Sequence, residues 1–205
     1  MSDPLAPLQI SLFTEDIGHE KYVGKLIRRI AAEYELSITI QAVSVRGGHG
    51  KVFTELRAYL VDIRRNVKSM PDILVVAVDA NKRGVNKTRK EINDIIDKFQ
   101  MPDFVVHAVP DPHIERWMLI DGSAFSAVFG KGCNAPDNEF GKSRYKKLLI
   151  EAIQASGTTP LLGGMEFADD IVDHLNLEKI RFADKSFGDL LHELEAMFRR
   201  LTPHP

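Results

Sequence analysis

The sequence predicts an α/β fold, a Rossmann-like parallel sheet flanked by helices and followed by a helical C-terminal portion. Strand-like and helical segments alternate through residues 8–109, beginning and ending with a strand. Strands that are joined by helices of about 10–15 residues imply parallel pairing and right-handed crossovers. The segments with regular spacing within residues 112–201 are all of the helical type.

Four segments are expected to be strands. Residues 8–13 are rich in apolar side chains, and residues 38–45 alternate between apolar and polar with a period of two. Residues 73–78 are apolar throughout and run directly into Asp79, which is typical of a strand buried on both faces. Residues 104–109 form the last expected strand.

Apolar residues that recur every three or four positions predict the helices. Tyr22, Leu26 and Ile30, for example, fall on one face of residues 18–34. The expected helices cover residues 18–34, 52–67, 87–99, 112–120, 140–156, 167–175 and 187–201.

We expect residues 1–121 to form an α/β core. Residues 122–205 would be a mainly helical extension that packs on this core. Loops rich in glycine and proline near residues 130–141 and 157–165 mark where the extension folds back. A separate second domain is not required, because 205 residues can form one large domain.

The composition limits the possible partners and the compartment. The net charge of −2 gives no global field that would draw the chain to a polyanion, so local patches must carry such binding. The single Cys133 excludes a disulfide framework and fits a reducing, cytoplasmic location. The N-terminus lacks the features of a signal peptide, and no apolar run approaches the roughly 20 residues that span a bilayer. We therefore expect no membrane partner.

Acidic side chains follow three of the expected strands. Glu15 follows the first, Asp79 and Asn81 follow the third, and Glu115 lies shortly after the fourth. The carboxyl ends of parallel strands lie at one edge of a sheet, where α/β proteins bind ligands, so these side chains could converge. Clustered carboxylates repel one another unless a cation lies between them. Convergence would imply Mg²⁺ or Mn²⁺, and two such ions would suit phosphodiester chemistry.

This pattern resembles the TOPRIM family, which includes topoisomerases, primases, recombination proteins and OLD-family nucleases. Glu15 matches the first family motif, and Asp79, Asn81 and Gly84 match the second. The segment from residue 110 to residue 117 resembles the Pro-x-x-x-x-Glu-x-Trp stretch of small stand-alone TOPRIM-like proteins beside ATPase genes in bacterial defence loci. The resemblance implies a nuclease of an anti-phage system and an ATPase partner of the AAA, ABC or SMC type.

The chain departs from the family pattern at two positions. Asp16 follows Glu15 where the family usually has glycine, and Asn81 stands where the second motif usually has a second aspartate. Asparagine can bind a cation through its carbonyl oxygen but brings no charge. Glu115 could restore that charge, and a catalytically degenerate protein is the alternative.

Several of these residues also have ordinary structural explanations. Asp16 could be a metal ligand or the N-terminal cap of the next helix. Glu115 could instead form a solvated helix face together with Asp111. We favour a core position for Trp117 over a stacking role. His19 and His113 could act beside the metal ligands or as general acids, but a surface role is preferred for both.

Basic residues near the expected metal edge could bind a polyanion. The glycine-rich loop at residues 47–50 does not have the spacing of a phosphate-binding P-loop, although its N–H groups and Lys51 could hold a backbone phosphate. A plain turn is the alternative. The candidate nucleic-acid contacts are Lys51, Lys82, Arg83, Lys87, Arg89 and Arg116.

The leading hypothesis is a nuclease, or a nuclease subunit, that uses Mg²⁺ or Mn²⁺ to cleave DNA or RNA. Its metal ligands would be Glu15, Asp79, Asn81 and Glu115. The catalytic residues would be Glu15, Asp79 and Lys82, with Glu15 as a ligand or general base and Lys82 beside the phosphate. The second hypothesis is a non-catalytic scaffold or regulatory subunit that docks on an ATPase. A domain that binds a phosphorylated small molecule ranks lowest, because the chain has no dinucleotide-binding glycine motif.

Overall fold

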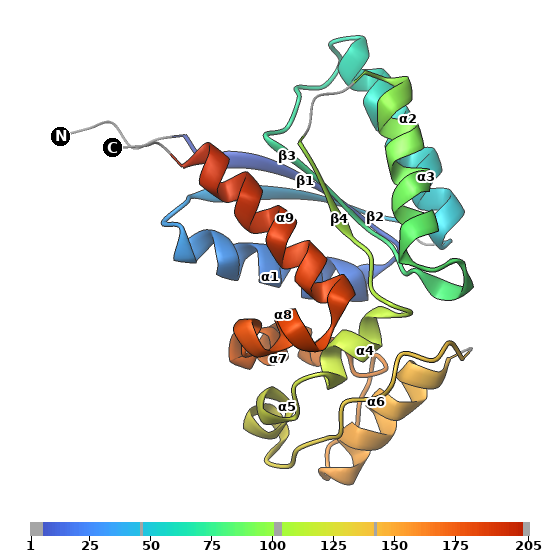
Figure 1. The fold of residues 1–205 in the computed structure, drawn as a ribbon, viewed down its shortest axis with the longest axis vertical. Helices are drawn as coiled ribbons and strands as arrows, with labels where there is room; N and C mark the ends of the chain where they lie inside the picture. The colour runs from blue at the N-terminus through green and yellow to red at the C-terminus, as the bar shows by residue number, and fades with distance from the viewer. Residues whose placement is uncertain (1–5, 46, 101–103, 142, 203–205) are drawn as a thin grey trace, which may run out of the picture.

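The structure, a computed structural model, describes residues 6–45, 47–100, 104–141 and 143–202. It confirms the predicted fold class (Figure 1): strands in the order β2–β1–β3–β4 form one parallel sheet with helices on both faces and a helical C-terminal region. The strands are β1 (Leu8–Thr14), β2 (Ile38–Ser44), β3 (Ile73–Ala77) and β4 (Val105–Ala108). The α-helices are α1 (Ile17–Glu33), α2 (His49–Arg64), α3 (Val85–Lys98), α4 (Ile114–Leu119), α5 (Gly122–Phe129), α6 (Arg144–Ala155), α7 (Ala168–His174), α8 (Leu177–Ala183) and α9 (Lys185–Leu201). Two 3₁₀ turns are η1 (Asn81–Arg83) and η2 (Met165–Phe167).

The expected strands and the longer expected helices are present, with shifted ends. The short helices α5 and α8 were not predicted, although α4 and α7, which are no longer, were. The start of α6 was predicted too early. Arg144 donates to the carboxylate of Asp137, and the hydroxyl group of Tyr145 donates to the carbonyl oxygens of Asp137 and Glu139. These bonds hold residues 137–139 against the first turn of α6 in a non-helical path.

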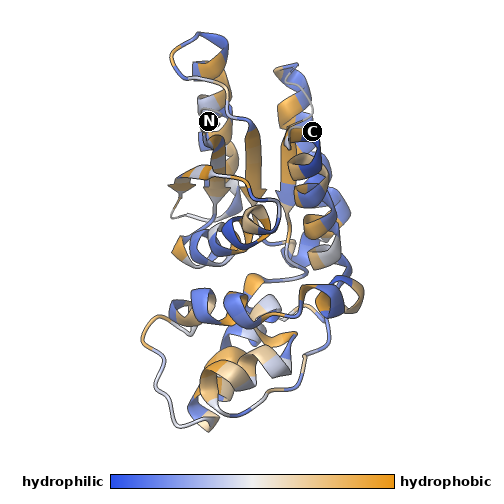
Figure 2. Cartoon of the chain, turned by 90° about the vertical axis from the view of Figure 1, so that its left-hand side faces the viewer, coloured by the Kyte–Doolittle hydropathy of each residue, from blue (hydrophilic) through white to orange (hydrophobic). Residues whose placement is uncertain are grey.

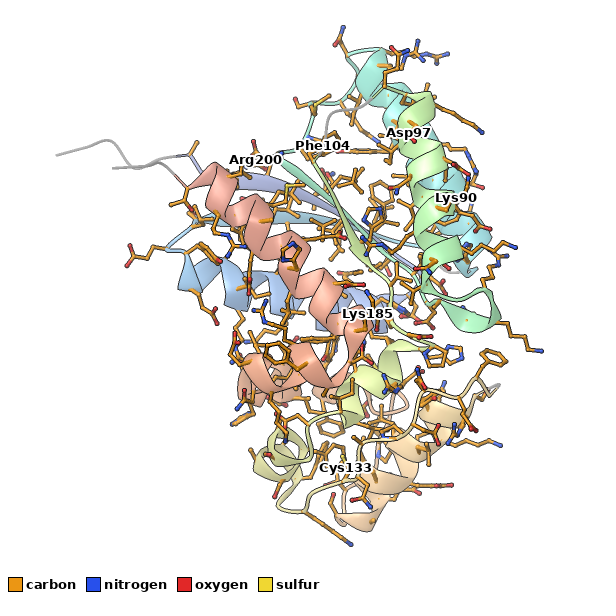
Figure 3. The ribbon with its side chains drawn as sticks, in the orientation of Figure 1. Lys90, Asp97, Phe104, Cys133, Lys185 and Arg200 are labelled. Carbon is orange, nitrogen blue, oxygen red and sulfur yellow. The ribbon has the colours of Figure 1, made fainter. Side chains whose placement is uncertain are left out.

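Two apolar clusters lie on opposite faces of the sheet. Helices α1 and α9 cover one face, and α2 and α3 cover the other (Figure 1). Figure 2 shows that the strands between them are predominantly apolar, whereas the helices are polar toward the outside. Lys90 and Asp97, for instance, point away from the sheet on the outer side of α3 (Figure 3). The alternation of side chains along each strand supplies both clusters: Leu12 faces the α1 side and Phe13 the α2 side.

The shorter helices form a second layer beyond the carboxyl edge of the sheet. Helices α4 to α8 lie below the sheet in Figure 1, and α7 packs against both α1 and α5. The cluster on the α1 side runs without a break from Leu12 through Trp117 to Ile171 and Leu191. This cluster therefore includes residues on both sides of the expected division at residue 121, and the division itself stays a prediction. Trp117 is fully buried there, as expected.

A buried ion pair fixes α4 under the sheet. Arg116 donates through Nη1 to the carboxylate of Asp184, and its Nε contacts backbone carbonyl oxygens in the loop before α6. Asp184 also caps α9, accepting from the backbone N–H of Phe187 at 2.8 Å and from the hydroxyl group of Ser186. Lys185, the first residue of α9, lies beside this junction (Figure 3). The predicted nucleic-acid contact by Arg116 does not fit this arrangement, because its guanidinium group is buried and occupied inside the fold.

Among the residues that the structure describes, no helix combines the length and the apolar character needed to cross a membrane.

We predict that Asp184→Ala lowers the free energy of unfolding by about 3–5 kcal/mol, because Arg116 would be left buried without its counter-charge. Urea denaturation followed by circular dichroism would measure this loss. Asp189→Ala is the matched control, since its carboxylate pairs with the exposed Lys185 at 2.7 Å and such pairs contribute at most about 1 kcal/mol. Equal losses in the two variants would show that the Asp184–Arg116 pair does not hold α4 in place.

Candidate metal centre

The predicted acidic residues meet at the carboxyl edge of the sheet. Glu15 directly follows β1, Asp79 lies two residues after β3, and Glu115 lies in the first turn of α4, beyond β4. These strands are neighbours in the sheet, and Thr14, Ala77 and Ala108 are in register at their ends. The parallel topology therefore brings together three segments that are far apart in the sequence.

Asp79, His113 and Glu115 form a group that could hold a metal ion. Each offers one ligand atom, and these atoms all lie within 4.8 Å of one another. Two carboxylates and an imidazole are common ligands of divalent cations in proteins. Glu15 lies beside this group rather than within it, and the assignments of Glu15 and Asn81 as metal ligands stay predictions.

Asp79 lies at the base of the group and is only 8% exposed. Its Oδ1 is 3.0 Å from Nε2 of His19 and accepts a hydrogen bond from the backbone N–H of Ile114 at 2.9 Å. Its Oδ2 is 3.0 Å from Nδ1 of His113. Burial alone would raise the pKa of Asp79, but the positive charge of His19 and the hydrogen bonds from both histidines outweigh it and lower the pKa. Asp79 is therefore held as a carboxylate in a site that excludes most water.

His19 is buried between two carboxylates. Its ring nitrogens each lie 3.0 Å from a carboxylate oxygen, Nδ1 from Asp16 and Nε2 from Asp79. Burial opposes protonation, but the charge of Asp79 and the hydrogen bonds to both carboxylates raise the pKa of His19 well above its ordinary value. A ring that faces acceptors on both sides is satisfied when both nitrogens carry hydrogen. The expected surface role of His19 was therefore wrong, since the residue is 2% exposed.

Asp16 resolves the alternatives left open by the sequence. It is the N-terminal cap of α1, and its Oδ1 accepts from the backbone N–H of His19 at 3.0 Å. The same oxygen contacts the His19 ring, so one carboxylate both starts the helix and orients the imidazole toward Asp79. Asp16 thus acts on Asp79 through His19.

His113 has one nitrogen held and one free. Its Nδ1 faces Asp79, whereas its Nε2 is buried and has no hydrogen-bond partner among the described residues. The expected surface role of His113 was also wrong. The signal that could have revealed it is its position two residues before Glu115, in the segment that follows the last expected strand.

The surroundings of Glu15 and Glu115 disfavour the ionised form of each carboxyl group. Burial, followed by the negative charge of Asp79, raises the pKa of Glu15 to about 7 and also raises that of Glu115. Oε1 of Glu15 is buried without a hydrogen-bond partner among the described residues. Unpartnered buried oxygens and crowded carboxyl groups are costly in a protein, and a cation would satisfy them. The residues present therefore fit a divalent metal ion.

Asn81 has a structural role in the turn after β3. Its φ of 51° lies in the left-handed region, which asparagine tolerates better than most residues. Its side-chain Nδ2 donates to the backbone oxygen of Asp79 at 3.3 Å, and its backbone N–H donates to the carbonyl oxygen of Pro112 at 3.0 Å. Asn81 thereby ties the Asp79 turn to the segment that leads into α4.

A second cluster, which the sequence did not reveal, flanks Glu15. Nδ1 of His49, at the start of α2, lies 3.8 Å from Oε1 of Glu15. Nε2 of His49 and Nη1 of Arg83 each lie 3.0 Å from the same oxygen of Glu91. These residues come from different elements, and of them only Arg83 was singled out from the sequence.

The other predicted nucleic-acid contacts have different surroundings. Lys82 lies in η1, with Nζ 5.3 Å from the centre of the Phe140 ring, and Lys87 is exposed on α3. Lys51 pairs with Glu55 at 2.9 Å on the surface of α2. Arg89 pairs with Glu193 and so joins α3 to α9. Lys82 and Arg83 are therefore the predicted basic contacts that the structure places in the turn after Asp79.

No family model, no curated protein and no solved structure matches this chain. The TOPRIM-like resemblance therefore stays a prediction. The fold and the site define an α/β protein with a candidate metal centre at the carboxyl edge of its sheet.

We predict that Glu15→Gln makes the chelator-treated protein more stable at pH 8 and changes its stability little below pH 4.5. The pKa of Glu15 is about 7 in the folded state against 4.5 for the ordinary group, so the folded state holds a proton that the unfolded state releases. Wild-type stability should therefore fall as pH rises through this window, and the glutamine variant should escape the loss, gaining roughly 1–3 kcal/mol.

Urea denaturation at the two pH values, with EDTA present, tests this prediction. Glu55→Gln, which removes an exposed carboxylate from a surface ion pair, is the control and should change stability by less than about 1 kcal/mol at both pH values. If Glu15→Gln destabilises the protein at pH 8, the description of Glu15 as a strained buried carboxyl group is wrong.

Proposed function

We propose that this protein is a metal-dependent phosphodiester hydrolase that acts on nucleic acid. The observation that carries the proposal is the meeting of Asp79, His113 and Glu115 at the carboxyl edge of the sheet, with Glu15 beside them. Basic residues of η1 follow Asp79 directly, so a polyanion that approached the metal group would meet Lys82 and Arg83. Carboxylates that bind a cation beneath a basic surface suit phosphodiester hydrolysis.

Each residue has a role that follows from its surroundings. Asp79, Glu115 and His113 would hold the ion, which would polarise the phosphate and lower the pKa of a bound water. Glu15, with a pKa of about 7, can accept the proton of an attacking water near neutral pH. His19 holds Asp79 in place through the hydrogen bond from its Nε2. Lys82 neutralises the charge that develops on the phosphate.

The ligand set also bears on the choice of ion. Carboxylates suit Mg²⁺ and Mn²⁺, whereas imidazole is rarely a ligand of Mg²⁺ and is accepted by softer ions. If His113 coordinates the ion, Mn²⁺ should bind more tightly than Mg²⁺. We therefore propose Mn²⁺ or Mg²⁺, with Mn²⁺ as the first probe.

The wider biological setting rests on the TOPRIM-like resemblance alone. That resemblance supports a cytoplasmic nuclease of an anti-phage defence system that works with an ATPase. The motif residues Glu15, Asp79 and Gly84 support it, and the comparisons with known proteins add nothing to it.

We predict that Asp79→Asn and Glu115→Gln each lower Mn²⁺-dependent cleavage at least a hundredfold, because each removes a charge from the metal group. Cleavage would be followed on labelled single-stranded and duplex DNA and RNA, and Mn²⁺ binding by calorimetry. Glu115→Gln guards against misfolding, since Glu115 is less buried than Asp79. Asp189→Ala, which is outside the site, should cleave like the wild type, and wild-type rates in both site variants would refute the proposed mechanism.

A second candidate function is a non-catalytic scaffold that assembles with an ATPase, and Asn81 favours it because the second family acid is absent. If it is correct, wild-type protein should show no Mn²⁺ binding at about 1 mM, the weak end of the range for divalent cation sites. Asn81→Asp provides a sharp comparison, because aspartate also tolerates the left-handed turn. A gain of Mn²⁺ binding and cleavage in Asn81→Asp alone would support the scaffold and contradict the nuclease.

A further inference from the structure

A pocket opens beside the candidate metal centre. Its volume is about 310 Å³, and it is lined by His49, Asn81, Lys82, Arg83 and Phe140. We call it the Phe140 pocket. The residues come from the start of α2, from η1 and from the loop before α6, so three separate segments form its walls. The volume lies at the lower end of the roughly 300–1,000 Å³ that is typical of small-molecule sites.

Two residues that line the Phe140 pocket, His49 and Phe140, lie close to side chains of the candidate metal centre. His49 is 3.8 Å from Oε1 of Glu15 through its Nδ1. On the other side, the Phe140 ring centre lies 5.6 Å from the ring centre of His113. A ligand in the pocket is therefore separated from the groups around Asp79 by single side chains.

The charges in the pocket are suited to an anion. Arg83 and His49 contact the same oxygen of Glu91, and this carboxylate partly neutralises the charge of Arg83. Lys82 differs, because within the described part of the chain its ammonium group lies over the Phe140 ring and no carboxylate pairs with it. The ammonium group of Lys82 is thus available to a phosphate at the mouth of the pocket.

Phe140 is held in an exposed position. It is 38% exposed, although the core beneath it is already filled by Tyr145, which is fully buried. The carbonyl oxygen of the preceding residue, Glu139, accepts hydrogen bonds from Arg144 at 3.0 Å and from the hydroxyl group of Tyr145 at 2.8 Å. These bonds fix the backbone next to Phe140, so an aromatic face is presented in a polar pocket by a restrained segment.

We propose that the Phe140 pocket binds one unpaired nucleotide of a single-stranded nucleic acid, with its base stacked on Phe140 and its phosphate on Lys82 and Arg83. This inference rests on the proposed function and specifies its substrate class. A base within a duplex is stacked and paired on its own strand and cannot reach an aromatic ring inside a pocket, whereas an unpaired base can. The neighbouring phosphate would then lie toward Glu15 and His113.

The test measures binding without cleavage, so that it is independent of the hydrolase proposal. Fluorescence anisotropy of the full chain in EDTA would compare labelled oligodeoxythymidine and oligouridine with a duplex of the same length. We expect at least one of the single strands to bind more tightly than the duplex. Phe140→Ala should raise the Kd of that strand roughly tenfold or more, because stacking on an aromatic side chain contributes strongly to single-strand affinity.

Three further variants separate stacking from general effects. Phe140→Trp should retain binding, since a larger ring can also stack. Lys82→Ala should weaken binding and reduce the dependence of log Kd on log salt concentration by about one. Phe182→Ala removes another exposed phenylalanine, 83% exposed on α8, and should bind like the wild type.

The outcomes decide the inference directly. It is overturned if the duplex binds as tightly as both single strands, or if Phe140→Ala binds like the wild type. Single-strand binding that depends on Phe140 supports it. If such binding is found but Mn²⁺ neither binds nor supports cleavage, the hydrolase proposal fails while the nucleotide pocket stands.

Discussion

The buried carboxylate of Asp79 stays ionised because nitrogen donors surround it. An isolated buried charge would be neutralised or would destabilise the fold, so the donors have to be in place whenever the chain is folded. They come from the first turn of α1, through His19, and from the start of α4, through His113 and the N–H of Ile114. The positions of these two helix ends are thereby fixed relative to β3.

The same network leaves the surrounding carboxyl groups unsatisfied. His19 and the N–H of Ile114 donate hydrogen bonds to Asp79. Burial and the negative charge of Asp79 meanwhile raise the pKa of Glu15 and of Glu115. Natural proteins keep such strained groups mainly where a ligand relieves them, because replacing them would usually raise stability. The contrast between the well-bonded Asp79 and its unsatisfied neighbours is what distinguishes this edge of the sheet from an ordinary acidic surface.

Much of the fold and part of the site could be predicted from the sequence, because both depend on local patterns. The apolar run before Asp79 and the alternation of strands and helices are local signals, and parallel pairing then places Glu15, Asp79 and Glu115 at one edge. The histidines were misjudged because a histidine at the start of a helix gives the same sequence signal whether it faces water or a carboxylate. Arg116 was misjudged because its partner Asp184 lies 68 residues away. Such long-range pairings are decided by tertiary packing and leave no mark in local spacing.

The strand order determines when the candidate metal centre can form as the chain is synthesised and folds. β1 cannot pair with β3 until the residues from Ile73 onward are available, and α4 is not held in place until Asp184 has joined Arg116. A growing chain would therefore carry Glu15 for most of its synthesis without a site around it. Contacts between distant residues form late and are lost together, so the centre should appear and disappear with the whole fold. An ion bound there would stabilise the whole fold, and its release would destabilise the sheet and the C-terminal helices together.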